Sequence, residues 1–169
     1  MLNFPFSEAT PNSHGETIAE SELLNIANRQ LNIYDCCRGI LDEKSVAFCE
    51  SKTFAMDSYD NVRQKIRCLY DERIMGAIPQ QSSLYACSIG ESAYDTPNGA
   101  IYLNHLLGEA KHFEKDEIYK LVGIGHENAS YKTSKEKNGL QNPQSILPKC
   151  LTSQQLILSI NSQMYTRRF

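Results

Sequence analysis

Short apolar segments alternate along the chain with longer stretches of helical periodicity, and this alternation restricts the possible folds more than any other feature. Three segments are short and apolar, as β-strands are: 31–36, 83–88 and 156–160. Four segments space apolar residues as amphipathic helices do: 19–30, 61–76, 99–111 and 115–124. Strands alternating with helices predict an α/β domain with a largely parallel sheet. Residues 41–60 and 127–154 are polar and are expected to be long loops.

Length and composition exclude several classes of protein. The chain has 169 residues and a net charge of −3, with 41% hydrophobic residues, which argues against intrinsic disorder and predicts a single domain over residues 1–169. The slightly acidic balance gives no reason to expect a nucleic-acid-binding face. No apolar run approaches the ~20 residues that span a bilayer, and the N-terminal segment lacks the features of a secretory signal. The sequence therefore predicts a cytosolic protein without membrane partners.

The six cysteines do not form a metal-binding pattern: Cys36, Cys37, Cys49, Cys68, Cys87 and Cys150. No Cys-x-x-Cys pair and no His/Cys cluster has the spacing of a zinc site, so we expect no metal and no cofactor. Without a secretory signal these cysteines are expected to be free thiols. Cys68 lies in a helical pattern and Cys87 in an apolar strand pattern, so both are predicted to be small core residues.

One thiol has the position of a reactive group. Cys37 follows an apolar strand and precedes Arg38, a cation of the kind that lowers a thiol pKa. Reactive groups of open α/β sheets gather beyond the carboxyl ends of strands. A cysteine nucleophile also needs a base, and His14 lies in a loop before the helix that leads into this strand. His105 and His112 lie on or beside a helix, where a packed or solvated histidine is expected, and nothing further supports His126.

These residues resemble a known family. Residues 35–39, Asp-Cys-Cys-Arg-Gly, resemble the nucleophile motif of the caspase-like cysteine peptidases, which include caspases, metacaspases and bacterial relatives. Residues 13–15, Ser-His-Gly, resemble the motif that supplies the base in that family. Residues 83–107 are similar to the small-subunit segment, with a strand, a substrate loop and a helix. The end of the chain, from Gln141-Asn142-Pro143 to residue 160, is similar to the closing loop and last strand.

The resemblance implies a fold and its organisation. The expected architecture is a caspase-like three-layer sandwich with a mostly parallel sheet. Residues 1–60 would form the part that resembles the large subunit and bears His14 and Cys37, and residues 61–169 the part that resembles the small subunit. Family members carry two strand–helix units ahead of the histidine motif, so we expect the domain to be N-terminally incomplete. An exposed sheet edge tends to pair with another chain, so a partner chain or a homo-oligomer is expected to complete the sheet.

The resemblance also implies a reaction. Cys37 would attack the scissile carbonyl and His14 would transfer the leaving-group proton. The backbone N–H groups of Gly15 and Cys37 would form the oxyanion hole. Asp35 would line the pocket for the residue before the cut, and a carboxylate there favours Arg or Lys. The substrate strand would lie beside three residues: Ser88, Ile89 and Gly90. The second acidic pocket residue of metacaspases has no clear counterpart, since Ile89 falls near its place.

Two other functions are compatible with the sequence, and one detail of the alignment is open. Residues 6–10 could instead occupy the place of the histidine motif, which would make His14 incidental. The chain could be a catalytically degenerate caspase-like module that binds or regulates. It could also be an unrelated α/β binding protein in which residues 35–39 match by coincidence.

If the chain is a peptidase, its substrate is a protein or peptide, and self-processing is expected near Lys44 or Lys52. Bacterial relatives often act in antiviral defence or cell death.

Overall fold

The computed structural model describes residues 2–3, 17–18, 20–36 and 61–166. In chain order its elements are β1 (Leu2–Asn3), β2 (Thr17–Ile18), the short 3-10 helix η1 (Glu20–Leu23), β3 (Arg29–Tyr34), α1 (Asn61–Met75), β4 (Gln80–Tyr85), β5 (Asp95–Thr96), β6 (Gly99–Ala100), α2 (Ile101–Glu109), β7 (Tyr119–Leu121), α3 (Val122–Glu136), β8 (Gln144–Ile146), the 3-10 helix η2 (Thr152–Gln154), β9 (Ile157–Ile160) and α4 (Gln163–Thr166). The described part of the chain is therefore α/β, as the sequence predicts. None of its helices is long and apolar enough to span a membrane.

A mixed three-stranded sheet forms the centre, in the order β3–β4–β8. β3 and β4 run parallel, and Tyr34 pairs with Tyr85 at their carboxyl ends. β8 runs antiparallel to β4, with Gln144 opposite Tyr85. Of the pairings in the described ranges, only β3–β4 is parallel, so the expectation of a mostly parallel sheet is wrong for this part. The physical reason is that the chain enters β8 beside the carboxyl end of β4 and must run back along it.

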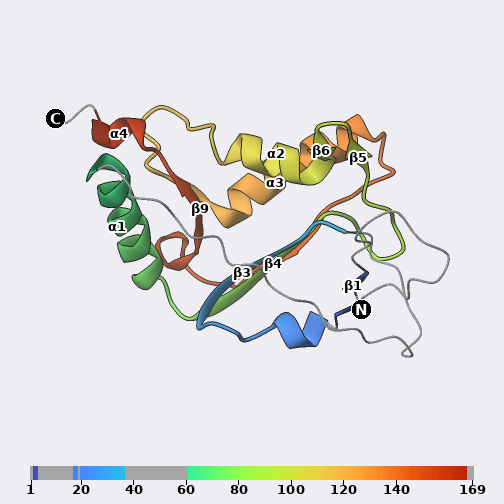
Figure 1. Ribbon diagram of the computed structural model, residues 1–169, viewed down its shortest axis with the longest axis horizontal. Coiled ribbons are helices and arrows are strands. Elements are labelled where there is room, and N and C mark those ends of the chain that lie inside the picture. Colours follow the sequence, from blue (N-terminus) through green and yellow to red (C-terminus); the bar gives the residue numbers. More distant parts are fainter. Residues whose placement is uncertain (1, 4–16, 19, 37–60, 167–169) are drawn as a thin grey trace.

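Helices cover the two faces of this sheet unequally. In Figure 1, α2 and α3 lie along one face and η1 lies on the other. The larger core packs Leu84 and Ala86 of the β4 segment against Tyr102 and Leu106 of α2 and Ala129 of α3. A smaller cluster on the opposite face joins three buried residues to Leu23 of η1: Tyr34, Cys36 and Tyr85. The two tyrosine rings of that cluster stack with their centroids 5.1 Å apart.

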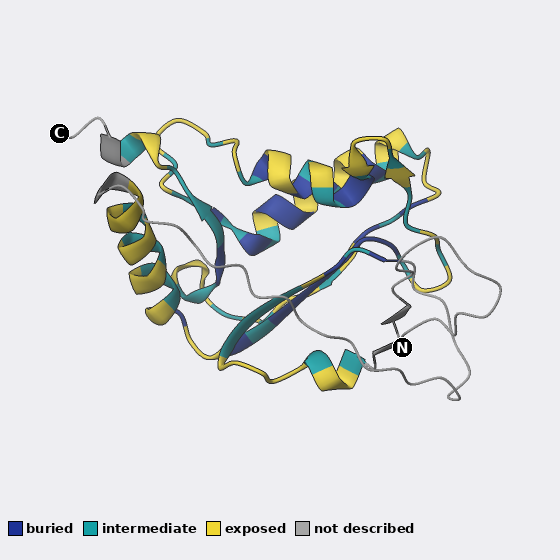
Figure 2. Cartoon of the chain, viewed as in Figure 1, coloured by how far each residue is buried: buried dark blue, intermediate teal, exposed yellow. Residues whose placement is uncertain are grey.

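The second, two-stranded unit pairs β7 with β9 in antiparallel register. The long helix α1 packs beside β9, and the Tyr70 hydroxyl donates to the Ile157 carbonyl at 3.3 Å. Figure 2 shows that α1 is exposed over most of its surface, whereas burial is concentrated in β4 and on the inner sides of α2 and α3. Cys68 lies on the exposed side of α1, so its prediction as a core residue is wrong, while Cys87 is fully buried as predicted.

Most strongly periodic segments have the predicted structure. The helices expected over 61–76 and 99–111 are α1 and α2, and the last strand, expected over 156–160, is β9. The two strands expected over 31–36 and 83–88 begin two or three residues earlier than predicted and end at Tyr34 and Tyr85. The last residues predicted for each strand, 35–36 and 86–88, follow the sheet and belong to the site described below.

Two predictions of secondary structure are wrong. The helix expected over 19–30 is limited to η1, because Asn25 has a φ of 60° and the Gln30 side chain accepts from the backbone N–H groups of Ile26 and Ala27. The helix expected near 115–124 begins only at Val122 and continues through the first ten residues of the expected loop 127–154. α3 was missed because its buried face is made largely of small and polar residues: Gly125, His126, Ala129 and Thr133.

Candidate functional site

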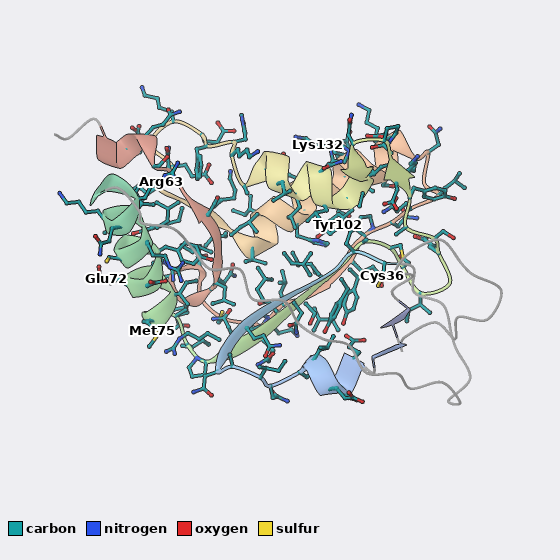
Figure 3. The ribbon with its side chains drawn as sticks, in the orientation of Figure 1. Cys36, Arg63, Glu72, Met75, Tyr102 and Lys132 are labelled. Carbon is teal, nitrogen blue, oxygen red and sulfur yellow. The ribbon has the colours of Figure 1, made fainter. Side chains whose placement is uncertain are left out.

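The carboxyl ends of β3 and β4 lie side by side and continue their pairing beyond the last strand residues. The Ala86 N–H donates to the Tyr34 carbonyl at 2.9 Å. The Cys87 thiol donates to the Cys36 carbonyl at 3.5 Å. Asp35 and Cys36 therefore lie beside Ala86 and Cys87, at the edge where reactive groups of α/β sheets are expected. Figure 3 shows Cys36 at this end of β3.

Neighbouring residues here face opposite sides of the sheet, as they do in any strand. Cys36 packs with Tyr34 and Tyr85 on the η1 side. The side chain of Asp35 influences Tyr102 of α2: burial and then the charge of Asp35 raise the pKa of the Tyr102 hydroxyl. Tyr102 belongs to the core on the α2 side of the sheet, so Asp35 lies on that side, away from the Cys36 thiol.

Asp35 is a half-buried carboxyl without a cationic partner among the described residues. Burial, and then the negative charge of Asp95, raise its pKa from 3.8 to about 6. Its Oδ1 atom is buried and has no hydrogen-bond partner in the described part of the chain. A carboxylate in this state is stabilised by any cation that enters beside it, because opposite charge favours the ionised form.

Asp95 is a candidate site residue that the sequence alone did not identify. It lies at the start of the hairpin β5–β6, which turns between Asp95–Thr96 and Gly99–Ala100. This hairpin brings the Asp95 charge close enough to raise the pKa of Asp35. Asp95 lies within the segment 83–107 that resembles the family, but only the fold shows that its carboxylate acts on Asp35. The charge of Asp95 thus acts on Asp35 at the carboxyl end of β3.

The loop after β4 holds the three residues predicted to lie beside a substrate. Ile89 is 64% exposed, and Gly90 has a φ of 83°, a backbone conformation that glycine adopts without strain. The Ser88 hydroxyl donates to the Asn142 carbonyl at 2.9 Å, so it is engaged within the protein. The exposed part of the loop is therefore Ile89 and Gly90, and Ser88 anchors it.

The residues predicted to perform the reaction lie outside the described part of the chain: His14, Gly15 and Cys37. The other three histidines lie in the described part. His105 pairs with Glu136 at 2.9 Å, and His112 is largely exposed. His126 is buried, its Nδ1 atom is 2.7 Å from the Tyr102 hydroxyl, and burial lowers its pKa. His105 is partly buried and His112 exposed, as the sequence predicts for these two, whereas the sequence does not predict the burial of His126.

Among residues 20–36 and 61–166, no group of three or more His, Cys, Asp or Glu side chains is placed to hold a metal ion. The carboxyl ends of β3 and β4 and the loop after β4 combine two adjacent strand ends, an exposed loop and the acidic residues Asp35 and Asp95, whose negative charge suits a cationic group. No protein-family model and no curated protein matches the chain.

Proposed function

We propose that the chain is a caspase-like cysteine endopeptidase that cleaves a protein partner after a basic residue. Cys37 is the nucleophile, His14 transfers the proton, and the N–H groups of Gly15 and Cys37 bind the oxyanion. In this reaction His14 takes the proton of the Cys37 thiol, and the sulfur bonds to the scissile carbonyl carbon. The C–N bond breaks as the leaving amine takes that proton from His14, and water then hydrolyses the thioester, which releases the acid and restores the thiol.

One observation carries the proposal: the Asp35 Oδ1 atom has no hydrogen-bond partner among the described residues, and burial and the charge of Asp95 raise the pKa of this carboxyl, which lies two residues before Cys37. An arginine or lysine side chain would find two negative groups there, and guanidinium–carboxylate pairing is strong and directional. Burying an unpaired carboxyl is unfavourable, so a position that keeps one is expected to have a use for it.

The test is hydrolysis of short fluorogenic peptides that end in Arg, Lys or Asp. We expect the Arg and Lys peptides to be cleaved, and Cys37→Ala to abolish cleavage. Asp35→Asn should lower kcat/KM for the Arg peptide roughly 10- to 100-fold, the effect of losing a hydrogen bond to a charged group. Asp95→Asn should have a smaller effect, since Asp95 is exposed and its charge is screened.

The matched control is Asp71→Asn, which removes an exposed carboxylate that pairs with Arg67 on α1. It should leave kcat/KM unchanged. Cleavage that survives Cys37→Ala, or a preference for the Asp peptide, would contradict the proposal. If Cys37→Ala and the unmodified chain both bind the Arg peptide and neither cleaves it, the chain is a binding module.

A further inference from the structure

The loop 88–91 after β4 is closed by one of its own side chains, the carboxylate of Glu91. The Ser88 N–H donates to Glu91 Oε2 at 3.2 Å, and the Glu91 N–H donates to the Ser88 carbonyl at 3.1 Å. The Cys87 Sγ atom, whose single proton can be donated to either the Cys36 or the Glu91 carbonyl, lies 3.3 Å from the Glu91 oxygen. These contacts fold the loop back on itself and leave Ile89 and Gly90 at its exposed tip.

The same carboxylate ties the loop to a distant part of the chain. The Asn142 backbone N–H donates to Glu91 Oε2 at 2.7 Å, and the Asn142 side-chain amide donates to Oε1 at 2.8 Å. The Ser88 hydroxyl adds a bond to the Asn142 carbonyl. Both oxygens of Glu91 are thus used, and the link joins the end of β4 to the segment that enters β8.

Asn142 is itself fixed by the end of α3. Its side-chain amide also donates to the Gly139 carbonyl at 2.7 Å, and its Oδ1 atom accepts from the Ser134 hydroxyl at 2.8 Å. The preceding residue, Gln141, is fully buried and donates to the Ala86 carbonyl at 2.8 Å. The anchor of the loop is therefore itself hydrogen-bonded to the end of α3 and follows a buried residue that is bonded to the β4 segment.

Glu91 holds this arrangement as an ion. Burial alone would raise the pKa of its carboxyl, but the hydrogen bonds from the Asn142 side chain, the Asn142 backbone and the Ser88 backbone outweigh it and lower the pKa. Hydrogen bonds to an ionised acceptor are stronger than neutral ones. Glutamine has nearly the same shape but offers one acceptor and one NH2 donor, so in either orientation its NH2 group would face an N–H donor.

We infer that Glu91 is the positioning residue of the substrate loop, which sets the backbone of Ile89 and Gly90 in the conformation that binds an extended peptide. This inference rests on the proposed function, because the peptide that the loop would bind is the substrate of that function. Glu91 does not touch the reacting atoms. Its loss should therefore weaken peptide binding while the chemical step continues in the peptides that do bind.

The experiment compares Glu91→Gln with the unmodified chain in three measurements. In peptide hydrolysis, KM for the Arg peptide should rise about tenfold while kcat changes less than about twofold, since binding energy is lost and the reacting groups are untouched. In calorimetry, an Arg-ended peptide amide should bind about tenfold more weakly when Glu91→Gln is combined with Cys37→Ala. In hydrogen exchange, the amides of Ser88 and Asn142 should exchange faster, because they lose their acceptor. Glu91→Asp, which keeps the charge, should recover part of the affinity.

The matched control is Glu117→Gln, in the loop that precedes β7. Its carboxylate accepts from the Lys120 ammonium at 2.7 Å and from the Glu114 N–H at 2.8 Å, so it is held as Glu91 is held, by a side chain and a backbone group. Even if Glu117→Gln lowers the stability of the protein, its KM and its affinity for the peptide should be unchanged. An equal rise in KM for both variants, or unchanged affinity and exchange in Glu91→Gln, would overturn the inference.

The two proposals fail in different ways. If the unmodified chain hydrolyses none of the peptides but binds the Arg peptide, and Glu91→Gln weakens that binding, the peptidase function fails and the positioning role of Glu91 stands. If the chain cleaves the peptides and Glu91→Gln behaves as the unmodified chain does, the function stands and the positioning role fails. If no peptide binds at all, both fail.

Discussion

Asp35 is the residue at which the proposed function and the stability of the fold oppose each other. Its pKa is raised from 3.8 to about 6, so the folded chain binds a proton there more readily than the unfolded chain. A carboxyl whose pKa is raised by folding contributes most to stability below pH 3.8, and this contribution is lost as the pH rises through about 6. At neutral pH the free protein therefore carries a destabilising charge, which a basic substrate would neutralise.

This conflict predicts that Asp35→Asn stabilises the protein at neutral pH while it removes the preference for basic substrates. We expect Tm at pH 7.5 to rise by about 2 to 4 °C, or ~1 kcal/mol after allowance for the partial exposure of Asp35. The gain should shrink as the pH falls through 6 and disappear below about pH 4, where the wild-type carboxyl is protonated. Thermal unfolding followed by circular dichroism across this pH range checks both the sign and the midpoint.

Asp71→Asn serves again as the comparison, since its carboxylate is exposed. Asp71→Asn should show no gain in Tm that shrinks as the pH falls through 6. A variant Asp35→Asn that is less stable than wild type at pH 7.5 would mean that the Asp35 carboxylate is paired with a cation in the free protein.

At the scale of elements, the sequence predicts α1 and α2 because their apolar residues recur at helical spacing. It misses α3 because packing there depends on small residues: a Cβ atom added at Gly125 would come within 2.7 Å of the Leu158 side chain. The same limit applies to the candidate site. Asp35 is predicted from the family resemblance of residues 35–39, whereas Asp95 influences it only through the fold of the hairpin β5–β6, which local sequence does not encode.

The first residue of β4 joins three elements by hydrogen bonds that periodicity does not reveal. Gln80 is 6% exposed, and its side-chain amide donates to the Gln154 carbonyl at 2.6 Å and to the Ile78 carbonyl at 3.1 Å. Its Oε1 atom accepts from the buried N–H of Leu156 at 3.2 Å. Gln80 thus connects β4 to η2 and to the segment that enters β9.

We predict that Gln80→Ala lowers the free energy of unfolding by about 2 to 4 kcal/mol, because the part-buried carbonyl of Gln154 and the buried N–H of Leu156 lose their partner. Urea denaturation measures the change. Gln81→Ala is the neighbouring control: its side chain is less buried and donates to the Ala27 carbonyl at 2.9 Å, in an exposed bond. It should cost less than about 1 kcal/mol. Equal costs for the two variants would show that the buried link does not hold the elements together.

At the scale of the whole molecule, the described sheet ends in two strands that have one partner each among the described residues, β3 and β8. Both carry an exposed aliphatic side chain: Ile33 on β3 is 39% exposed and Ile146 on β8 is 62% exposed. An edge strand with unpaired backbone groups and an apolar side chain is a template for pairing with another chain. β3 has six residues and β8 has three, so β3 offers the longer row of backbone groups.

We therefore predict that the protein self-associates through the β3 edge as its concentration rises, and that Ile33→Lys weakens this association because a lysine on an edge strand opposes strand pairing. Sedimentation velocity over the micromolar range gives the measurement. Ile146→Lys tests the shorter edge and should have the smaller effect. Leu107→Lys on α2, which replaces a side chain that is 49% exposed away from both edges, should have none. Since all three variants add the same charge to an exposed apolar position, a difference among them reports the location of the contact and not the charge of the molecule. A wild-type protein that stays monomeric throughout the range would show that its sheet edges do not pair.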